Sequence, residues 1–378
     1  MQTDKFCSDI QKKGGVNQIK LVDVINQLLK SKTAFVAFRQ PQNDEPQLFA
    51  GGEFSCLDSL DIVPEHGFVF HPFDADNEKI RFLKPQQIST GWELQFDFST
   101  LSSQQNKVFQ AIVAPYVGSK TEYIRQAASL ISKLRSGHLK KVVLSRLIVY
   151  ELGEVVDWGR KFEQLCQKYP TAFVYVLSDG QGLFWAGATP ETLISVNNQR
   201  AYTMALAGTQ AAKLNPEEKY FWQSKEREEQ QYVTDYIAGI LVDLGVKKLT
   251  ISETTTHLAG KLAHLVNHID FELPAQFSAL SLAQKFHPTP AICGFPKEKA
   301  FELILEKEQH KRSFYSGFLG IIQENKTADF YVNLRCVQVV GNQLYSYVGG
   351  GLTADSNPEK EWAETVLKSQ TMLSLFIK

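Results

Sequence analysis

The segment GGGLTADSNPEKEWAETVLKSQ, residues 349–370, runs from three consecutive glycines into a Ser-Asn-Pro helix start. The helix predicted after it carries Glu361 and Glu364 three residues apart, and Lys368 four residues further on. Residues three and four apart share one face of a helix. The sequence therefore predicts two carboxylates and an ammonium on one helix face, just beyond a glycine loop.

A second helical segment, KEREEQQYV, repeats the pattern with Glu226 and Glu229. Four carboxylates brought together would repel one another unless a cation lay between them, and all-oxygen ligands favour Mg²⁺ over zinc. The glycines would leave room for an anion near the helix N-terminus. The alternative is a solvent-exposed charged face containing Lys225 and Arg227, with the glycines in a turn or bulge.

Composition limits the class of protein. The 378 residues are 43% apolar and 11% aromatic, which is enough for a large core. A net charge of −1 argues against nucleic acid or an anionic membrane as a partner. The polar N-terminus lacks the apolar core of a signal peptide, and the five scattered cysteines contain no CxxC pair. These features predict a reduced cytoplasmic enzyme without zinc or a redox disulfide.

The pattern of elements predicts an α+β fold with antiparallel sheets. Helical patterns cover 120–135 and 218–245, and a last helix starts with Ser356 or Asn357 as its cap and Pro358 in its first turn. Strand patterns joined by short turns cover 32–39, 66–73, 92–98, 141–151, 172–196, 200–209, 316–324, 329–340 and 343–351. A doubly wound parallel sheet would need a regular alternation of strand and helix, which is missing.

Eight motifs, in order, resemble the chorismate-utilising enzymes, which include isochorismate, salicylate, anthranilate and aminodeoxychorismate synthases. They are KKVVLSR (140–146), FWAGATPETLISV (184–196), ALAGT (205–209), SKEREEQ (224–230), HPTPAICGFP (287–296), FYSGFLG (314–320), VNLRC (332–336) and the segment 349–369. The resemblance covers about residues 115–378. The N-terminal third is similar only in general character.

The resemblance implies two large antiparallel sheets flanked by helices, with the active site between them. It divides the chain into an N-terminal part, 1–115, and a chorismate-binding catalytic region, 116–378, within one integrated structural domain. It also implies a magnesium-dependent reaction on chorismate by a monomer, without a glutaminase subunit.

The resemblance assigns the metal to four glutamates. Glu229 and Glu364 resemble direct Mg²⁺ ligands, and Glu226 and Glu361 resemble partners acting directly or through metal-bound water. The metal would hold the ring carboxylate of chorismate. Substrate contacts are expected from Gly208, Thr209, Ala291, Tyr315, Arg335, Gly349, Gly350, Gly351 and Lys368. The chain departs from many relatives at Gln230 and Gln210, where a histidine and a basic residue are common.

Forming isochorismate requires water to attack ring carbon 2 while the hydroxyl on ring carbon 4 departs, which needs a base and an acid. By resemblance Lys141 is the base and Glu191 the acid. Glu191 must then hold its proton near neutral pH, so we expect a raised pKa. His287 resembles a pocket residue that hydrogen-bonds the substrate. Without the motifs, these residues would be interpreted as a solvent-facing lysine, an exposed glutamate and a structural histidine.

Ala291 separates the members of the family. Isochorismate synthases typically have alanine at this position, where the other synthases resemble one another in having threonine. The sequence therefore favours isochorismate synthase, with salicylate synthase second and an ammonia-using synthase third. A non-catalytic chorismate-binding protein would not need both Lys141 and Glu191. Isochorismate feeds menaquinone or siderophore synthesis, and menaquinone is slightly preferred as the housekeeping pathway.

Overall fold

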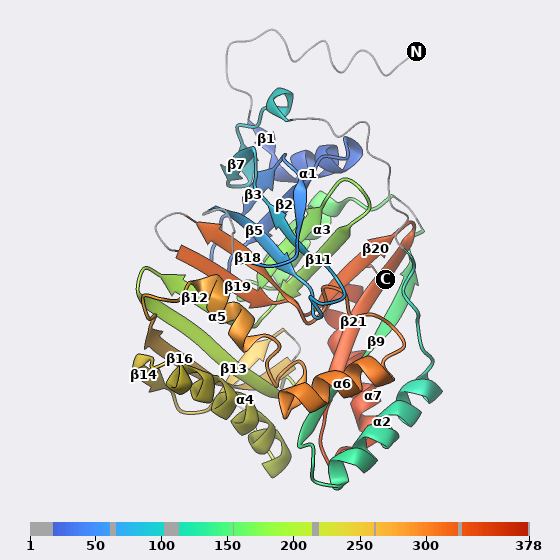
Figure 1. The fold of residues 1–378 in the computed structure, drawn as a ribbon. Helices are drawn as coiled ribbons and strands as arrows, with labels where there is room; N and C mark the ends of the chain where they lie inside the picture. The colour runs from blue at the N-terminus through green and yellow to red at the C-terminus, as the bar shows by residue number, and fades with distance from the viewer. Residues whose placement is uncertain are drawn as a thin grey trace.

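The computed structural model describes residues 18–60, 66–101, 113–153, 155–213, 219–260, 262–323 and 327–376. Within these ranges it contains helices and antiparallel strands, which confirms the predicted α+β class (Figure 1). The helices are α1 (Leu21–Lys30), α2 (Lys120–Arg135), α3 (Trp158–Lys168), α4 (Ser224–Asp243), α5 (Ala279–Phe286), α6 (Lys297–Lys307) and α7 (Pro358–Leu373). None of the described helices has the length and apolar character needed to cross a lipid bilayer.

Two large sheets contain most of the strands. The first has the order β17 (Gly294–Phe295), β9 (Lys141–Glu151), β21 (Gln343–Leu352), β20 (Cys336–Val340), β11 (Phe184–Thr189), β10 (Phe173–Ser178), β2 (Phe35–Arg39), β3 (Gln47–Ala50) and β7 (Gln87–Thr90). The second has the order β14 (Lys247–Ile251), β16 (Leu262–Glu272), β13 (Arg200–Ala211), β12 (Thr192–Asn197), β19 (Thr327–Val332), β18 (Phe318–Gln323), β5 (Gly67–His71), β6 (Ile80–Leu83) and β4 (Phe54–Leu57). β15 (Thr255–Ala259) also pairs with β16, and β1 (Ile19–Lys20) pairs with β8 (Glu93–Leu94).

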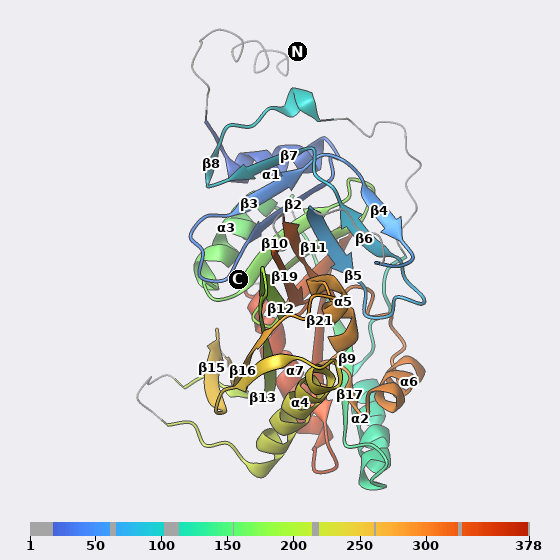
Figure 2. The ribbon, with the colours of Figure 1, turned by 60° about the vertical axis from the view of Figure 1, so that its left-hand side comes forward.

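An aromatic core lies between the two sheets. It includes Phe38 and Trp185 from the first sheet and Phe70 from the second, all fully buried. Phe70 stacks on Phe314 with 4.0 Å between ring centroids. Strands from before and after residue 115 lie side by side in both sheets, because β2 pairs with β10 in the first sheet, as Figure 2 shows, and β5 pairs with β18 in the second.

Helices cover the outer faces of the sheets. α1 and α3 pack on the first sheet, and α4 and α5 pack on the second. α2 and α6 pack beside β9, and α7 packs against β21, toward the lower right of Figure 1. Side chains cap the N-termini of several of these helices. Ser119 forms a capping box with Glu122 at the start of α2, and the Asn357 side chain accepts hydrogen bonds from backbone amides in the first turn of α7.

Some expectations need correction. The three glycines lie inside β21, paired with Ser145, Leu144 and Val143 of β9, so they do not form a loop. The long helix begins at Ser224, and Glu218 lies outside the described residues. The predicted strand at 92–98 contains only β8, followed by a short 3₁₀ turn at Phe98–Thr100.

Candidate active site

A cavity opens between β21 and β13, at the end of the sandwich where α4 and α7 lie. Figure 1 places these four elements around the lower part of the molecule. The cavity is lined by side chains or backbone of Val143, Pro190, Glu191, Leu206, Ala207, Gly208, Thr209, Glu229, His264, Ala291, Ile292, Tyr315, Ser316, Leu334, Arg335, Tyr347, Val348, Gly349, Gly351 and Lys368. Ten of the predicted site residues therefore meet at this cavity.

The three glycines of β21 make room for polar side chains. A Cβ on Gly351 would lie 2.6 Å from Oε1 of Glu229, and a Cβ on Gly349 would lie 2.9 Å from the Tyr315 hydroxyl. A Cβ on Gly350 would lie 3.3 Å from Oε2 of Glu361. Glycine in a strand interior often marks a close approach of another group. Here the approaching groups are carboxylates and a phenol.

Three carboxylates near these glycines are each paired with one lysine. Glu229 lies 2.9 Å from the Nζ atom of Lys141. Glu361 lies 2.7 Å from Nζ of Lys225, and Glu364 lies 2.7 Å from Nζ of Lys368. Lys141 is fully buried and Glu361 is 2% exposed, so these charges are largely removed from water.

The pKa values of two of these glutamates reflect that environment. Burial alone would raise the pKa of Glu229, but the charge and hydrogen bond of Lys141 hold it below its ordinary value. Burial and the neighbouring Glu364 carboxylate raise the pKa of Glu361, against the opposing charge of Lys225. The ionised form is thus favoured for Glu229 and disfavoured for Glu361.

The donor set fits a hard divalent cation. Glu229, Glu361 and Glu364 all lie near Gly350 and Gly351, and carboxylate oxygens are the ligands Mg²⁺ prefers. Oε2 of Glu361 is buried and has no hydrogen-bond partner in the described part of the chain. Within the described ranges, no three acidic, histidine or cysteine side chains are grouped closely enough to bind a metal ion as they lie. Glu229, Glu361 and Glu364 instead each form an ion pair with a lysine.

Glu226 lies beside the cluster with a different contact. Its carboxylate accepts a hydrogen bond of 3.0 Å from the Gln223 amide and so caps the first turn of α4. Its Cβ would lie 3.2 Å from a Cβ on Gly208. Gln230, which stands where many relatives have histidine, donates to the Ala205 carbonyl and to Oδ1 of Asn267, both at 2.8 Å. These bonds hold α4 on the second sheet.

Glu191 is the buried acid of the cavity. It follows Pro190 in the short turn between β11 and β12 and is 3% exposed. Burial raises the pKa of Glu191 to about 8, although the charges of Lys141, Arg335 and Lys368 oppose this shift. Near neutral pH its carboxyl group is therefore mostly protonated, as a general acid requires.

Cationic and hydroxyl groups line another part of the cavity. Lys368 donates to the Gly349 carbonyl at 3.0 Å as well as pairing with Glu364. Burial raises the pKa of Tyr315 to about 12, so its hydroxyl keeps its proton. Arg335 and Ser316 both have positive φ, 48° and 59°. Such backbone strain in non-glycine residues clusters at functional sites.

A bulge in β13 exposes Gly208 and Thr209 to the cavity. The pairing with β16 shifts register between Ala207 and Gln210, and Gly208 has φ +62°. Bulges of this kind redirect side chains next to active sites. His264 of β16 lies behind the bulge, with Nδ1 2.9 Å from the Gly208 carbonyl.

Sequence reasoning missed His264, although it lines the cavity. Its Nδ1–H donates to the Gly208 carbonyl, which leaves Nε2 as the acceptor, 3.5 Å from Nη2 of Arg335. Burial, with the charges of Arg335 and Lys368, lowers the pKa of His264 well below its ordinary value. The ring is therefore neutral. The partly alternating pattern LAHLVNHIDFE predicts a strand, but it places His264 on the face opposite the apolar Ile269 and Phe271 and so gives no sign that His264 faces the cavity.

His287 does not reach this cavity. It ends α5, and its Nε2 lies 3.1 Å from the Phe73 carbonyl. Its ring packs against His71 and Phe318 at centroid distances of 5.1 and 5.4 Å. The structure thus places His287 in a packed aromatic cluster, while Ala291, four residues later, lines the cavity.

Comparison with known proteins identifies the family. The family of chorismate binding enzymes matches residues 77–377. Isochorismate synthase EntC of Escherichia coli is 29% identical over 282 residues, which cover 72% of this chain and 71% of that protein. A crystal structure of a protein described as a 2,3-dihydroxybenzoate-specific isochorismate synthase, DhbC from Bacillus anthracis, has a TM-score of 0.76 and 26% identity, covering 92% of this chain and 98% of that one. The menaquinone-specific isochorismate synthase MenF of Escherichia coli shares the fold, with a TM-score of 0.78 and 21% identity over 95% of this chain and 93% of that one. The chain belongs to the family of chorismate-binding enzymes.

Proposed function

We propose that the protein is a magnesium-dependent isochorismate synthase. In this reaction water adds to ring carbon 2 of chorismate and the hydroxyl on ring carbon 4 departs. The observation that carries the proposal is the buried carboxyl of Glu191, whose pKa of about 8 keeps a proton available in the cavity. The relatives named above, EntC and DhbC, are described as isochorismate synthases, which supports the same activity here.

Glu191 acts as the general acid. Its proton goes to the departing hydroxyl oxygen, which leaves as water, and its carboxylate is then stabilised by Arg335 and Lys368, the cations that already act on it. A carboxyl group that was ionised from the start could not make this donation. The burial of Glu191, which is 3% exposed, therefore contributes to the mechanism, because it keeps the carboxyl group neutral.

Lys141 acts as the general base toward the attacking water. In the structure its ammonium is paired with Glu229 at 2.9 Å. If Glu229 held a metal ion, it would no longer be committed to Lys141 alone, and the amine of Lys141 would be the group that accepts the proton of the attacking water.

The remaining residues bind and orient the substrate. Arg335, Lys368 and the Tyr315 hydroxyl offer donors to the enolpyruvyl carboxylate, with the bidentate fork of Arg335 fixing its plane. Mg²⁺ would be held by Glu229 and Glu364, with Glu361 and Glu226 bound directly or through water, and would supply positive charge for the ring carboxylate. Glycines 349–351 keep this wall of the cavity free of side chains.

Incubation of the purified protein with chorismate and Mg²⁺ tests the proposal, with products separated by chromatography. Isochorismate as the sole product supports it. Salicylate with pyruvate would instead identify a salicylate synthase, and an aromatic amine formed only with ammonia would identify an ammonia-using synthase. Product formation that persists unchanged in EDTA would rule out the magnesium requirement.

A further inference from the structure

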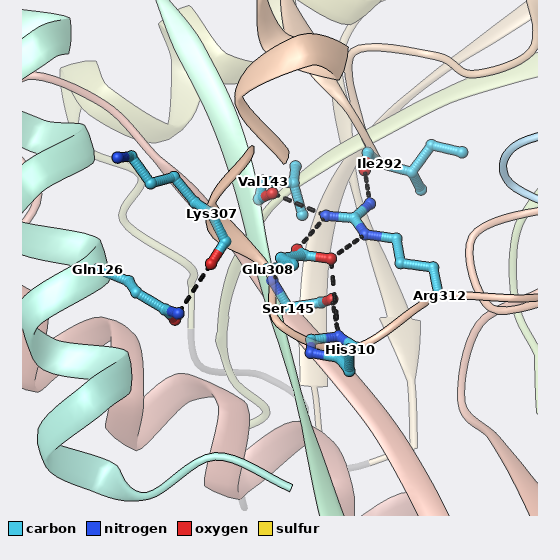
Figure 3. A network of polar contacts seen from close by, with 8 residues as sticks. All are labelled: Gln126, Val143, Ser145, Ile292, Lys307, Glu308, His310 and Arg312. Atoms are coloured by element: carbon cyan, nitrogen blue, oxygen red, sulfur yellow. Dashed lines mark hydrogen bonds and ion pairs between the residues drawn. The ribbon is translucent and has the colours of Figure 1, made fainter. Parts of the chain in front are cut away.

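The outer edge of β9 is completed by side chains. β17 pairs with β9 only at Lys141 and Val142. Beyond that point the Val143 carbonyl accepts from Nη2 of Arg312 at 2.8 Å, and the Ser145 amide donates to Oε1 of Glu308 at 2.7 Å. A side-chain pair thus replaces the missing neighbouring strand, as Figure 3 shows.

Glu308 and Arg312 form a buried, bidentate ion pair. Nε and Nη2 of Arg312 lie 2.8 and 2.6 Å from the two carboxylate oxygens, and both side chains are 2% exposed. Burying such a pair is costly unless the remaining donors and acceptors are also satisfied. Arg312 meets this condition through Nη1, which donates to the Ile292 carbonyl at 2.8 Å.

The pair does not belong to a hydrolytic triad, although Ser145 and His310 lie next to it. The Ser145 hydroxyl is 2.9 Å from Nε2 of His310, and Glu308 is 3.6 Å from the same nitrogen. In a triad the serine and the carboxylate contact opposite nitrogens of the ring. The cluster therefore has no arrangement for relaying a proton from Ser145.

The contacts of Arg312 join two walls of the cavity. Val143 lies two residues after Lys141 on β9, so their side chains share one face of the sheet. Ile292 directly follows Ala291, and both line the cavity. The Val143 amide also donates to the Cys293 carbonyl at 2.7 Å. One guanidinium thus fixes the turn bearing Ala291 against the strand bearing the proposed base.

We propose that the Glu308–Arg312 pair positions Ala291 relative to Lys141 and thereby sets turnover and product outcome. Neither side chain is among the cavity-lining residues, so the pair acts through Val143 and Ile292. This inference rests on the proposed isochorismate synthase activity. Displacements of about 1 Å at a reacting centre can reduce the rate about 100-fold.

Arg312→Lys tests this role, because lysine keeps the charge beside Glu308 but cannot donate to both carbonyls and both carboxylate oxygens at once. We expect kcat to fall at least about 10-fold, with KM for chorismate changing less than about threefold and elimination to salicylate rising. Arg39→Lys is the matched control. Arg39 is also buried and donates to carbonyls of residues 40, 43, 169, 170 and 172, none of which lines the cavity. Its variant should lose melting temperature but keep kcat and product ratio.

Amide hydrogen exchange, measured without substrate, tests whether the backbone near the cavity is held in place, independently of activity. We expect faster exchange at the Val143, Ser145 and Cys293 amides in Arg312→Lys but not in Arg39→Lys. Glu308→Gln is the second variant, used if Arg312→Lys does not fold, with the same expected loss of kcat. A lower melting temperature with unchanged kcat and product ratio would overturn the positioning role. A wild type that makes no isochorismate would overturn the proposed function instead, and the exchange result would still test whether the Glu308–Arg312 pair fixes Val143 and the turn bearing Ala291.

Discussion

Replacing Glu191 by glutamine removes the proposed acid while keeping its size and its buried position. General acids typically contribute about 10²–10⁴-fold to a rate, so we expect kcat to fall by that factor. In the wild type, kcat/KM should fall as pH rises through about 8, where the Glu191 carboxyl loses its proton. The variant should lack this alkaline limb, because an amide does not titrate in this range.

The same substitution should stabilise the protein. The folded pKa of Glu191 is about 8, against an ordinary value of 4.5, so between these values the unfolded chain has lost a proton that the folded chain keeps. The stabilising contribution is fully present below the lower value and is lost as pH rises through the folded pKa. A pH of 7 lies about 2.5 pH units above the ordinary pKa of 4.5. At roughly 1.4 kcal/mol per unit, about 3 kcal/mol of this contribution to the free energy of unfolding is lost by pH 7. Glu191→Gln avoids this loss.

Chemical denaturation at pH 4 and pH 7, with initial rates from pH 6 to pH 9, measures both effects. Asp329→Asn is a suitable control, because burial also raises the pKa of Asp329 but its carboxylate contacts Ser195 and Gln40 rather than the cavity. The control should keep the wild-type rate. A Glu191→Gln variant with a rate within about tenfold of wild type, or with the same alkaline limb, would refute the acid role.

Four further substitutions probe the metal site and the product specificity. Glu229→Gln and Glu364→Gln should each nearly abolish turnover and weaken Mg²⁺ binding in calorimetry, with circular dichroism unchanged, and normal metal affinity would exclude them as ligands. Gly351→Ala places a Cβ 2.6 Å from Oε1 of Glu229, so we expect a loss of activity of at least about 10-fold in a folded protein, and an unchanged rate would mean that Glu229 can move freely. Ala291→Thr adds a methyl and a hydroxyl to the cavity wall and should depress isochorismate formation in favour of salicylate and pyruvate. If Ala291 serves only in packing, the melting temperature should fall through overpacking of roughly 1–3 kcal/mol without a change in product ratio.

The sequence predicted elements best where the local signals agreed. Lys120–Arg135 and Lys141–Glu151 have the predicted bounds, because the first has a capping box and the second is rich in β-branched and apolar residues. α1 and α3 were missed, and so was β16. Both helices carry a local signal, because their buried apolar residues, such as Leu21, Val24, Ile25 and Leu28 in α1, have helical spacing, so this signal was present and was overlooked.

The candidate site was predicted mainly through the motifs. They indicated residues that the fold brings together from β9, β13, α4, β21 and α7, although these elements are far apart in the sequence. His264 was missed because its place in the site depends on the register between β13 and β16 and on the bulge at Gly208. The pairing of Glu229 with Lys141 and of Glu361 with Lys225 was also missed. Lys225 reaches Glu361 across 136 positions, a contact that only the tertiary structure creates.

The central claim, that water attacks chorismate in this cavity, is tested most directly by running the reaction in water labelled with the heavy oxygen isotope. Isochorismate isolated early in the reaction should carry one labelled oxygen, in the hydroxyl on ring carbon 2, and the Glu191→Gln variant should form it at a strongly reduced rate. Unlabelled isochorismate would show that the hydroxyl migrates within the substrate, and salicylate or an aromatic amine in its place would assign the chain a different reaction within its family.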